Sequence, residues 1–469
     1  MKPAYSFRPQ VAQLEGPPSK VPLRELLPRV AAHARVALLD SAGGAPRDWS
    51  LLAFDPLPPC AEPDRGRGFG LAALVAQLAL EGEPPPWFAG GFIGALAYEL
   101  GPFGESLTLP PDPWGWPRVV GGLYVDFIVR DERAGKSFLV LGEEPGDARP
   151  ALAVRRERLL DELSRPAPSA DVHAGEVRRL VPAAEHVARI ERAREAIAAG
   201  ECYQANVTHR FLRAVRGTPE DLYRRLVAAH PAPYAGFLRF AEGALLSLSP
   251  ELLLAVDPTE DGVVARTRPI KGTRPRRSSP DADRAESERL LRSAKDRAEL
   301  AMIVDLGRND LGRLARPGAV RVGEFPQLES YVSVHHLAAD VSATLAAGYD
   351  GLDALEALFP GGSVTGAPKA RTMELLAEFE GEGRGFSYGA FGFHGLDGRA
   401  RWNLLIRSPL WRACDAAAEF DGELGWRVGG GITWSSDAWE EEAESLDKGA
   451  PLIAALDPLT ASSLTPGMR

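Results

Sequence analysis

The chain has 469 residues, of which 45% are hydrophobic and 25% charged, and its formal net charge is −10. This length exceeds the usual limit of a single hydrophobic core and predicts two domains or one elaborate two-layer domain, and the composition is that of a soluble globular protein. The negative charge argues against a general nucleic-acid binder, which needs a basic surface.

The N-terminal segment and the cysteines indicate a cytoplasmic protein that binds no membrane. Residues 1–10 lack the apolar core of a signal peptide. The most apolar run, Trp87 to Leu100, is too short to span a bilayer and contains three glycines. The three cysteines are far apart and outside any metal-type spacing, so we expect reduced thiols.

The first third of the chain, residues 1–165, mixes short strands, such as one expected over 122–129, with loops. A polar, proline-containing stretch then predicts a linker over 166–184. Beyond the linker, apolar residues recur with helical spacing over 186–199 and a glycine follows, which predicts an amphipathic helix.

Later elements alternate irregularly between strands and helices. We expect strands over 204–211, 234–240, 244–256, 385–393, 402–408 and 425–433, and helices over 282–306 and from Ala438 onward. The last helix should begin there because Asp437, followed three residues later by Glu440, forms a capping-box pattern. Without regular βαβ alternation, the chain is expected to be α+β. We divide it into an N-terminal unit (1–165), the linker (166–184), a second domain (185–457) and a tail (458–469).

Lys271 is the most informative single residue. It lies between an isoleucine and a glycine, in a run that holds six Arg or Lys residues between Arg266 and Arg277. A partly buried amine beside other cations has a lowered pKa and acts as a nucleophile. The alternatives are a solvated turn and a patch that binds phosphate or a small polyanion.

Two pairs of carboxylates suggest a metal site. Glu441 and Glu444 are three residues apart on the last helix and Lys448 is four further on, so all three share one face. Asp296 and Glu299 form a similar pair on the long helix. If both helices face one cleft, the four carboxylates can hold one Mg²⁺, two of them directly and two through water. The alternative is a pair of solvated, salt-bridged helix faces.

A glycine-rich loop over 359–371 leads into a helix and suits an anion. Free backbone N–H groups there would receive the anion, and the hydroxyls of Ser363 and Thr365 would assist. The loop lacks the ending of a P-loop, so a carboxylate is favoured over a nucleoside triphosphate. His336 precedes an apolar residue and is either a core histidine or part of the site.

Taken together, these runs resemble the chorismate-utilising enzymes, and within them the branch that makes aminodeoxychorismate. The matching segments occur in the order of the family: 249–251, 268–273, 295–299, 305–313, 359–369 and 429–448. The likeness is strong from Glu185 to Leu452. It implies an α+β fold with a two-layer β-sandwich core, helices packed outside, a smaller N-terminal subdomain and a chorismate-binding catalytic domain.

The resemblance also implies a role for each matched residue. Glu299 and Glu444 would ligate Mg²⁺ directly, Asp296 and Glu441 would hold its waters, and the metal would bind the ring carboxylate of chorismate. The other substrate contacts that it implies come from Arg407, the backbone of Gly429, Gly430 and Gly431, and the side chains of His336, Ser363 and Lys448.

Within the family, Lys271 distinguishes the branches. Anthranilate synthases have alanine at this position, and ammonia reaches C2 of chorismate directly. In the aminodeoxychorismate branch the lysine attacks C2 as the C4 hydroxyl leaves, and ammonia then adds at C4 and expels the lysine. Glu251 matches the acid that protonates the leaving group, and burial in an apolar strand would raise its pKa enough for donation near pH 7.

Three alternatives follow from the same comparison. An anthranilate or isochorismate synthase is the other enzymatic reading, although Gln204 stands where the isochorismate branch has its activating lysine. A non-catalytic scaffold would have lost Lys271 or an acidic metal position, and all are present.

None of the cysteines has the context of a glutaminase nucleophile, so ammonia should come from a separate glutamine amidotransferase subunit. Asp40–Ser41 departs from the tryptophan-feedback motif, which makes feedback by tryptophan doubtful.

Overall fold

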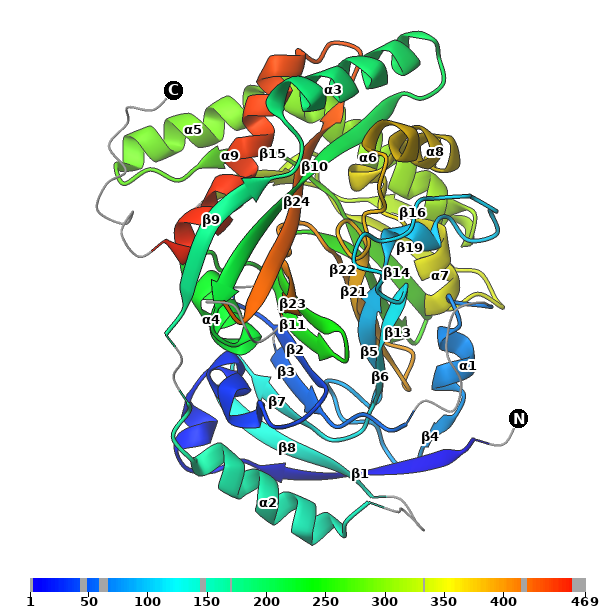
Figure 1. Cartoon of the computed structure of the whole chain (residues 1–469). Coiled ribbons are helices and arrows are strands. Elements are labelled where there is room, and N and C mark those ends of the chain that lie inside the picture. Colours follow the sequence, from blue (N-terminus) through cyan, green and yellow to red (C-terminus); the bar gives the residue numbers. More distant parts are fainter. Residues whose placement is uncertain are drawn as a thin grey trace.

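The computed structural model describes residues 3–42, 49–58, 66–143, 149–168, 171–331, 334–414 and 420–457. Two large β-sheets pack against each other, and helices cover their outer sides (Figure 1). The expected tail over 458–469 lies outside the described residues. Across the described ranges, no helix has both the length and the apolar content required to cross a bilayer.

The larger sheet has thirteen strands drawn from the whole length of the chain. Its path runs through β20 (Gly366–Ala367), β10 (Gln204–Arg216), β24 (Gly422–Ile432), β23 (Leu410–Ala413), β12 (Gly243–Ser249), β11 (Tyr234–Phe240), β2 (Val36–Asp40), β3 (Trp49–Phe54), β7 (Phe127–Asp131), β8 (Lys136–Glu143), β1 (Tyr5–Gln13) and β4 (Leu78–Leu80), and β9 (His173–Arg179) pairs with β10. The antiparallel pairing of β2 with β11 joins the N-terminal strands to the later ones.

The second sheet has eight strands and the third has three. The eight are β16 (Ala315–Val322), β19 (Val341–Leu345), β14 (Gly262–Arg268), β13 (Leu252–Thr259), β22 (Ala400–Leu404), β21 (Ala390–Gly395), β5 (Gly91–Leu96) and β6 (Val119–Tyr124), and the three are β15 (Ile270–Pro275), β18 (Val334–Ala338) and β17 (Gln327–Ser330). The two large sheets touch closely, because a Cβ on Gly236 of β11 would lie 2.5 Å from the Phe391 ring of β21.

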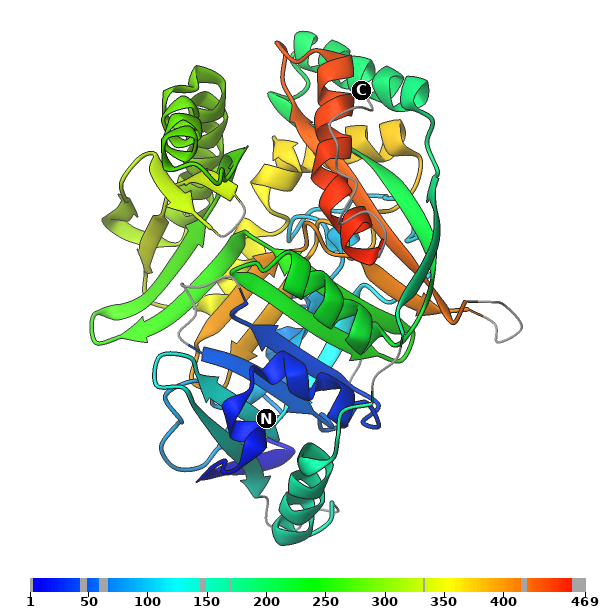
Figure 2. The same ribbon diagram turned by 90° about the vertical axis from the view of Figure 1, so that its left-hand side faces the viewer.

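The helices lie outside this sandwich. They are α1 (Leu71–Val75), α2 (Leu152–Ser164), α3 (Ala183–Ala198), α4 (Pro219–Ala229), α5 (Pro280–Arg292), α6 (Ala294–Gly312), α7 (Gly351–Leu358), α8 (Lys369–Glu380) and α9 (Ala438–Leu456), with 3₁₀ turns η1 (Pro17–Lys20), η2 (Leu23–Val30), η3 (Tyr98–Leu100) and η4 (Gly362–Val364). Figures 1 and 2 place α9 and the α5–α6 pair at the same end of the molecule.

The predicted α+β class and the two-layer sandwich core are confirmed. The N-terminal residues 1–165, however, complete both large sheets, since β2 and β3 extend one and β5 and β6 extend the other. The division of the chain into domains stays a prediction. Part of the expected linker forms β9, where Ala174 and Val177 pack against a hydrophobic cluster under β10 and α4.

The single strand expected over 244–256 is two strands in different sheets. Pro250 has no N–H for a ladder hydrogen bond, so β12 ends at Ser249. The Ser249 hydroxyl accepts from the backbone N–H of Glu251 at 3.2 Å, and β13 then begins in the opposite sheet. Glu251 therefore lies where the chain crosses between the sheets. The strand expected over 122–129 is divided in the same way between β6 and β7.

The helix expected over 282–306 is also two helices. Ser293 has an extended backbone, and its hydroxyl caps α6 by accepting from the N–H of Asp296 at 3.3 Å. Asp296 and Glu299 thereby lie at the start of α6 and not in mid-helix. The expected start of α9 is confirmed, because Asp437 accepts from the N–H groups of Trp439 and Glu440 at 3.0 Å each.

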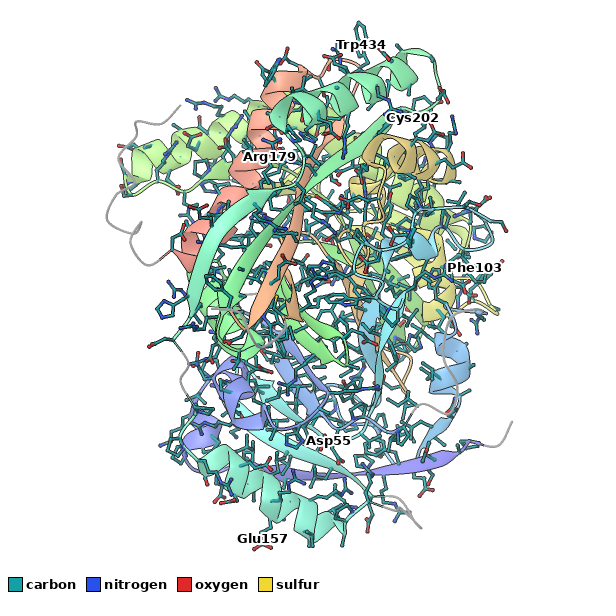
Figure 3. All side chains as sticks on the ribbon, in the orientation of Figure 1. Asp55, Phe103, Glu157, Arg179, Cys202 and Trp434 are labelled. Carbon is teal, nitrogen blue, oxygen red and sulfur yellow. The ribbon has the colours of Figure 1, made fainter. Side chains whose placement is uncertain are left out.

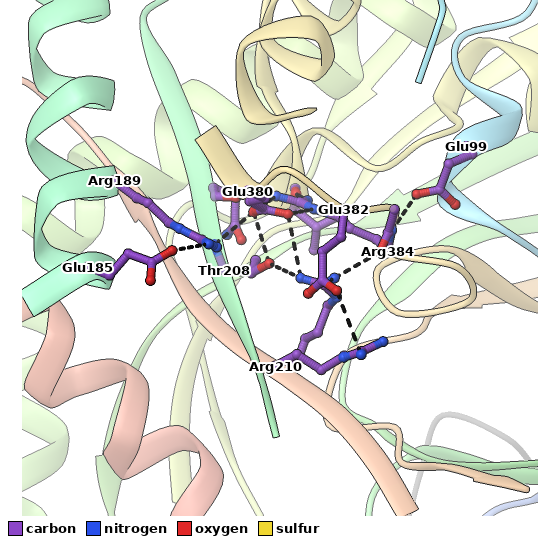
Figure 4. Close-up of polar contacts among 12 residues, drawn as sticks. Glu99, Glu185, Arg189, Thr208, Arg210, Glu380, Glu382 and Arg384 are labelled. Atoms are coloured by element: carbon purple, nitrogen blue, oxygen red, sulfur yellow. Dashed lines mark hydrogen bonds and ion pairs between the residues drawn. The ribbon is translucent and has the colours of Figure 1, made fainter. Parts of the chain in front are cut away.

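A buried ion network ties α8 to β10 and β24 (Figure 4). Glu380 accepts from the Arg384 guanidinium at 2.6 Å and from the backbone N–H of Thr208 at 2.9 Å. Arg427 of β24 lies 3.7 Å from Glu380 and donates to Glu382 at 2.7 Å. Since Glu380, Arg384 and Arg427 are all buried, each charge depends on its partners.

Replacing Glu380 by glutamine should lower the free energy of unfolding by about 3–5 kcal/mol, because the buried Arg384 loses its counter-ion and Arg427 keeps only Glu382. The matched control is Glu201→Gln, which breaks the exposed ion pair with Arg371 and should have a much smaller effect. Chemical denaturation of both variants measures the difference, and equal effects would contradict this account of the network.

Candidate active site

A run of glycines at the end of β24, Gly429–Gly431, brings charged side chains of several elements together. A Cβ on Gly430 would lie 2.9 Å from the Glu441 carboxylate, and a Cβ on Gly431 would lie 3.3 Å from Nζ of Lys271. Any side chain here would therefore displace the predicted site residues. The glycine run, which we expected to lie beside the substrate, lies between α9 and Lys271.

Lys271 is mostly buried on β15, with 13% of its side chain exposed. Its charged neighbour is the Glu299 carboxylate, 4.0 Å away. The strand bulges directly after it at Gly272, where φ is +70° and the pairing with β18 shifts by one residue. This bulge directs the segment over the start of α6, because a Cβ on Gly272 would lie 2.9 Å from Cγ of Asp296.

The expected cluster of cations around Lys271 is wrong for Arg268 and Arg276, which have acidic partners of their own. Arg268 forms ion pairs with Glu329 and Asp340. Arg276 pairs with Asp283 at 2.9 Å. Alternation along the strand and hairpin sends these guanidinium groups to other acidic partners, so a carboxylate and not an arginine lies next to the lysine.

Glu251 is buried, with 4% of its surface exposed. Ser363 of η4 donates a hydrogen bond to its carboxylate at 2.6 Å. Burial raises the pKa of Glu251 to about 7, against the opposing effects of the Ser363 hydrogen bond and the charge of Lys271. The site thus contains a carboxylic acid that can hold a proton near neutral pH.

His336, Arg407 and Lys448 line one cavity, together with Tyr331. Nδ1 of His336 lies 3.1 Å from the carbonyl oxygen of Gly272, which can only accept, so Nδ1 carries the proton of the neutral ring. Burial lowers the pKa of His336 to about 4, and its Nε2 is buried without a partner among the described residues. Nε2 is therefore an acceptor ready for a ligand hydroxyl.

Arg407 is a cation without a counter-ion. Its backbone is left-handed, with φ of +50°, and burial lowers the pKa of its guanidinium. Within the described residues no carboxylate lies within ion-pair distance of it. Lys448, in contrast, pairs with Glu444 at 3.0 Å and donates to the carbonyl of Gly429 at 3.0 Å. An unpaired arginine in a cavity suits an anionic ligand.

The four predicted carboxylates lie on two helices on either side of Lys295, and no three of these described residues have ligand atoms within 4.8 Å of one another. Lys295 lies between them, 4.0 Å from Glu299 of α6 and 3.3 Å from Glu441 of α9. Burial raises the pKa of Glu299, and the charges of Glu441 and Asp296 add to this. Burial alone would raise the pKa of Glu444, but the neighbouring Lys448 holds it below its usual value. The four groups offer only carboxylate oxygens, which are the ligands that Mg²⁺ prefers. The ammonium group of Lys295 already lies between two of them.

A different group has the closest metal-like spacing. Among the described residues, only the ligand atoms of His186, His209 and Glu442 lie within 4.8 Å of one another. The two imidazoles stack at 4.0 Å, and a metal must lie in the plane of each ring, so one ion cannot bind both. Arg179 also neutralises Glu442 at 2.6 Å, and Figure 3 shows it beside α9. These contacts fix the far face of α9 and so turn Glu441, Glu444 and Lys448 toward the site.

The expectation of free N–H groups in the glycine-rich loop is wrong at two positions. The N–H groups of Val364 and Thr365 are used inside η4, on the carbonyls of Gly361 and Gly362. Thr365 is buried, and its carbonyl accepts from the N–H of Asn206 at 2.9 Å. The loop positions the hydroxyl of Ser363 on Glu251.

Gln204 is a candidate that sequence reasoning passed over as a binding residue. It is fully buried, and neither atom of its amide has a hydrogen-bond partner among the described residues. Its Nε2 lies 2.8 Å from the position of a Cβ on Gly431. The sequence signal that could have identified Gln204 as a binding residue was an amide side chain at the start of an apolar strand.

A cavity with an unpaired cation, beside a buried acid that titrates near pH 7, suits an enzyme that acts on a small organic acid. A family model described as chorismate binding enzyme matches residues 66–454. The chain belongs to this family, which confirms the resemblance, and it is an enzyme that uses chorismate.

Individual relatives differ in the product that their names state. The chain is 36% identical over 434 residues to anthranilate synthase component 1 of Streptomyces coelicolor, covering 88% of this chain and 82% of the relative. It is 35% identical over 378 residues to aminodeoxychorismate synthase component 1 of Klebsiella aerogenes, covering 80% and 79%. These near-equal identities leave the product open.

Solved structures support the same fold. Anthranilate synthase component I of Streptococcus pneumoniae is 28% identical with a TM-score of 0.72, covering 87% of this chain and 93% of that one. MenF, the menaquinone-specific isochorismate synthase of Escherichia coli, has a TM-score of 0.72 at 18% identity, covering 97% and 96%. The second likeness concerns the fold alone.

Replacing Gly272 by alanine should destabilise the protein more than the matched change Gly318→Ala. Both positions have a left-handed backbone, with φ of +70° and +73°, so both variants carry a similar backbone strain. Only at Gly272 would the new Cβ meet neighbours, Leu290 at 2.8 Å and Asp296 at 2.9 Å. We expect an additional loss of about 1–3 kcal/mol in denaturant unfolding. Equal losses would contradict the close packing at this bulge.

Proposed function

We propose that the protein is the chorismate-binding component of an aminodeoxychorismate synthase. It would convert chorismate and ammonia to 4-amino-4-deoxychorismate, a precursor of 4-aminobenzoate and folate. The observation that supports this proposal is that Lys271 lies near enough to the buried Glu251 for its charge to affect that acid. Burial raises the pKa of Glu251 to about 7, and the charge of Lys271 acts against this rise. The reaction needs these two groups together, one as nucleophile and the other as proton donor.

The acidic groups of chorismate would be held by the unpaired Arg407, by Lys448 and by the backbone of Gly429–Gly431. His336 and Ser363 would lie against the ring, and Thr365 would support the loop that carries Ser363. Glu299 and Glu444 would ligate Mg²⁺, with Asp296 and Glu441 holding its waters. The metal would bind and polarise the ring carboxylate.

The chemistry requires two displacements. Nζ of Lys271, after losing a proton, forms a bond to C2 while both ring double bonds shift and the C4–O bond breaks. Glu251 supplies the proton with which the hydroxyl leaves as water. Ammonia then bonds to C4 and gives up a proton, both double bonds shift back, and the bond between C2 and Nζ breaks as Nζ takes up a proton.

An anthranilate synthase is the second candidate, and the identity to the Streptomyces relative favours it as strongly as the Klebsiella relative favours the first. Lys271 argues against it, because ammonia attacks C2 directly in that reaction and needs no lysine there. The isochorismate reaction needs a base for water where this chain has the buried, uncharged Gln204.

Ammonia would come from a partner subunit. The relatives are named component 1, which supports an assembly with a second component. We expect that component to be a glutamine amidotransferase, and we expect the assembly to act in the cytoplasm.

Lys271→Ala should reduce aminodeoxychorismate formation by several orders of magnitude, while the exposed control Lys136→Ala should leave it unchanged. The assay supplies purified protein with chorismate, Mg²⁺ and ammonium and separates the products by chromatography. Anthranilate as the main product of the unaltered protein would overturn the proposal. Unchanged activity in Lys271→Ala would overturn the nucleophile role.

The pH dependence should report Glu251. Because its pKa is raised to about 7, the protonated acid is present below that pH, and kcat should fall as the pH rises through it. Glu251→Gln should lose about 10²–10⁴-fold in kcat and lack this limb. Ser363→Ala removes a hydrogen bond that favours the carboxylate, so its limb should move to higher pH. A limb that stays in place, or moves to lower pH, would contradict the assignment.

A further inference from the structure

A second cavity, of about 250 Å³, lies apart from the candidate active site. It is formed by the segment around residues 97–118 and by Gly385 and Phe386, and none of the residues assigned to chorismate or Mg²⁺ lines it. Its volume suits a molecule of one ring and a short substituent. Neither the family match nor the proposed reaction gives this cavity a role.

Glu99, which follows Tyr98 in η3, supplies the cavity with a carboxylate that lacks one partner. One oxygen accepts from the backbone N–H of Arg384, a contact drawn in Figure 4. The other oxygen, Oε2, is buried and has no hydrogen-bond partner among the described residues. The Arg384 guanidinium cannot serve it, because that group is engaged by Glu380. A buried carboxylate oxygen without a donor is destabilising, so a donor from a ligand would be favourable.

The remaining walls combine apolar side chains with one exposed cation, Arg118. Leu107, Leu109, Trp116 and Phe386 line the cavity, and the rings of Trp116 and Phe386 lie 6.2 Å apart. Asp112 adds a second carboxylate, one oxygen of which accepts from the backbone N–H of Trp116 at 3.0 Å. Aromatic faces beside carboxylates favour a cation that carries an apolar group.

We propose that this cavity binds a small organic amine. Its ammonium group donates to Oε2 of Glu99, and its apolar group packs against Trp116 and Phe386. A bare divalent cation does not fit, because it needs about six oxygen ligands and the walls are largely apolar. A carboxylic acid is disfavoured, because the two carboxylates of Glu99 and Asp112 outnumber the single cation of Arg118.

Benzylamine is the probe, and isothermal titration calorimetry on the full-length protein is the measurement. Benzylamine should bind, benzyl alcohol should bind at least about tenfold more weakly, and benzoate should not bind. Glu99→Gln keeps an acceptor for Arg384 but removes the charge, and it should weaken benzylamine binding by about 10- to 100-fold. The matched control is Glu105→Gln, an exposed change outside the cavity that should leave the affinity unaltered.

A second variant tests the proposal independently if Glu99→Gln does not fold. Leu107→Trp fills the cavity and keeps the carboxylate, so it should abolish binding while the unfolding transition stays close to that of the unaltered protein. The proposal is overturned if benzylamine up to about 10 mM does not bind the unaltered protein. Equal binding of benzoate, or unchanged affinity in either cavity variant, also overturns it. None of these outcomes depends on which product the enzyme makes.

Discussion

The burial of the Glu251 carboxyl at the crossing between two sheets is the constraint on which the rest of the site depends. Pro250 ends β12, and the next residue passes into the opposite sheet with its side chain enclosed. Enclosure makes the protonated acid stable near neutral pH, and Ser363 sets how stable it is. Lys271 lies close enough for its charge to act against the rise in the pKa of Glu251.

Charged side chains can approach the backbone this closely only at glycines, which have no side chain. Gly430 and Gly431 admit Glu441 and Lys271 next to the backbone of β24, and Gly272 admits Asp296. Lys271 and Lys295 therefore lie among the carboxylates of the predicted metal site, and their positive charges limit the repulsion among these acidic groups. The cavity beside them retains one unpaired cation, Arg407, and this distinguishes a binding site from a balanced ion-pair network such as that of Glu380.

Local patterns in the sequence predicted those parts of the structure that local chemistry determines. Asp437 starts α9 because its side chain caps two N–H groups, and the three-residue spacing does place Glu441 and Glu444 toward one site. The break at Pro250 was missed because the passage into the opposite sheet depends on strand partners distant in the chain. The break at Ser293 was missed although its hydroxyl caps Asp296 only three residues away. The partners of the arginines near Lys271 and the orphaned amide of Gln204 depend on elements distant in the chain.

The central claim is that Lys271 becomes covalently bonded to the substrate. The most direct test is to mix the protein with chorismate and Mg²⁺ in the absence of ammonia, stop the reaction with acid, digest the protein and analyse the peptides by mass spectrometry. The account predicts that the peptide containing Lys271 gains the mass of chorismate less one water. A peptide that stays unmodified while chorismate is consumed on addition of ammonia would contradict it.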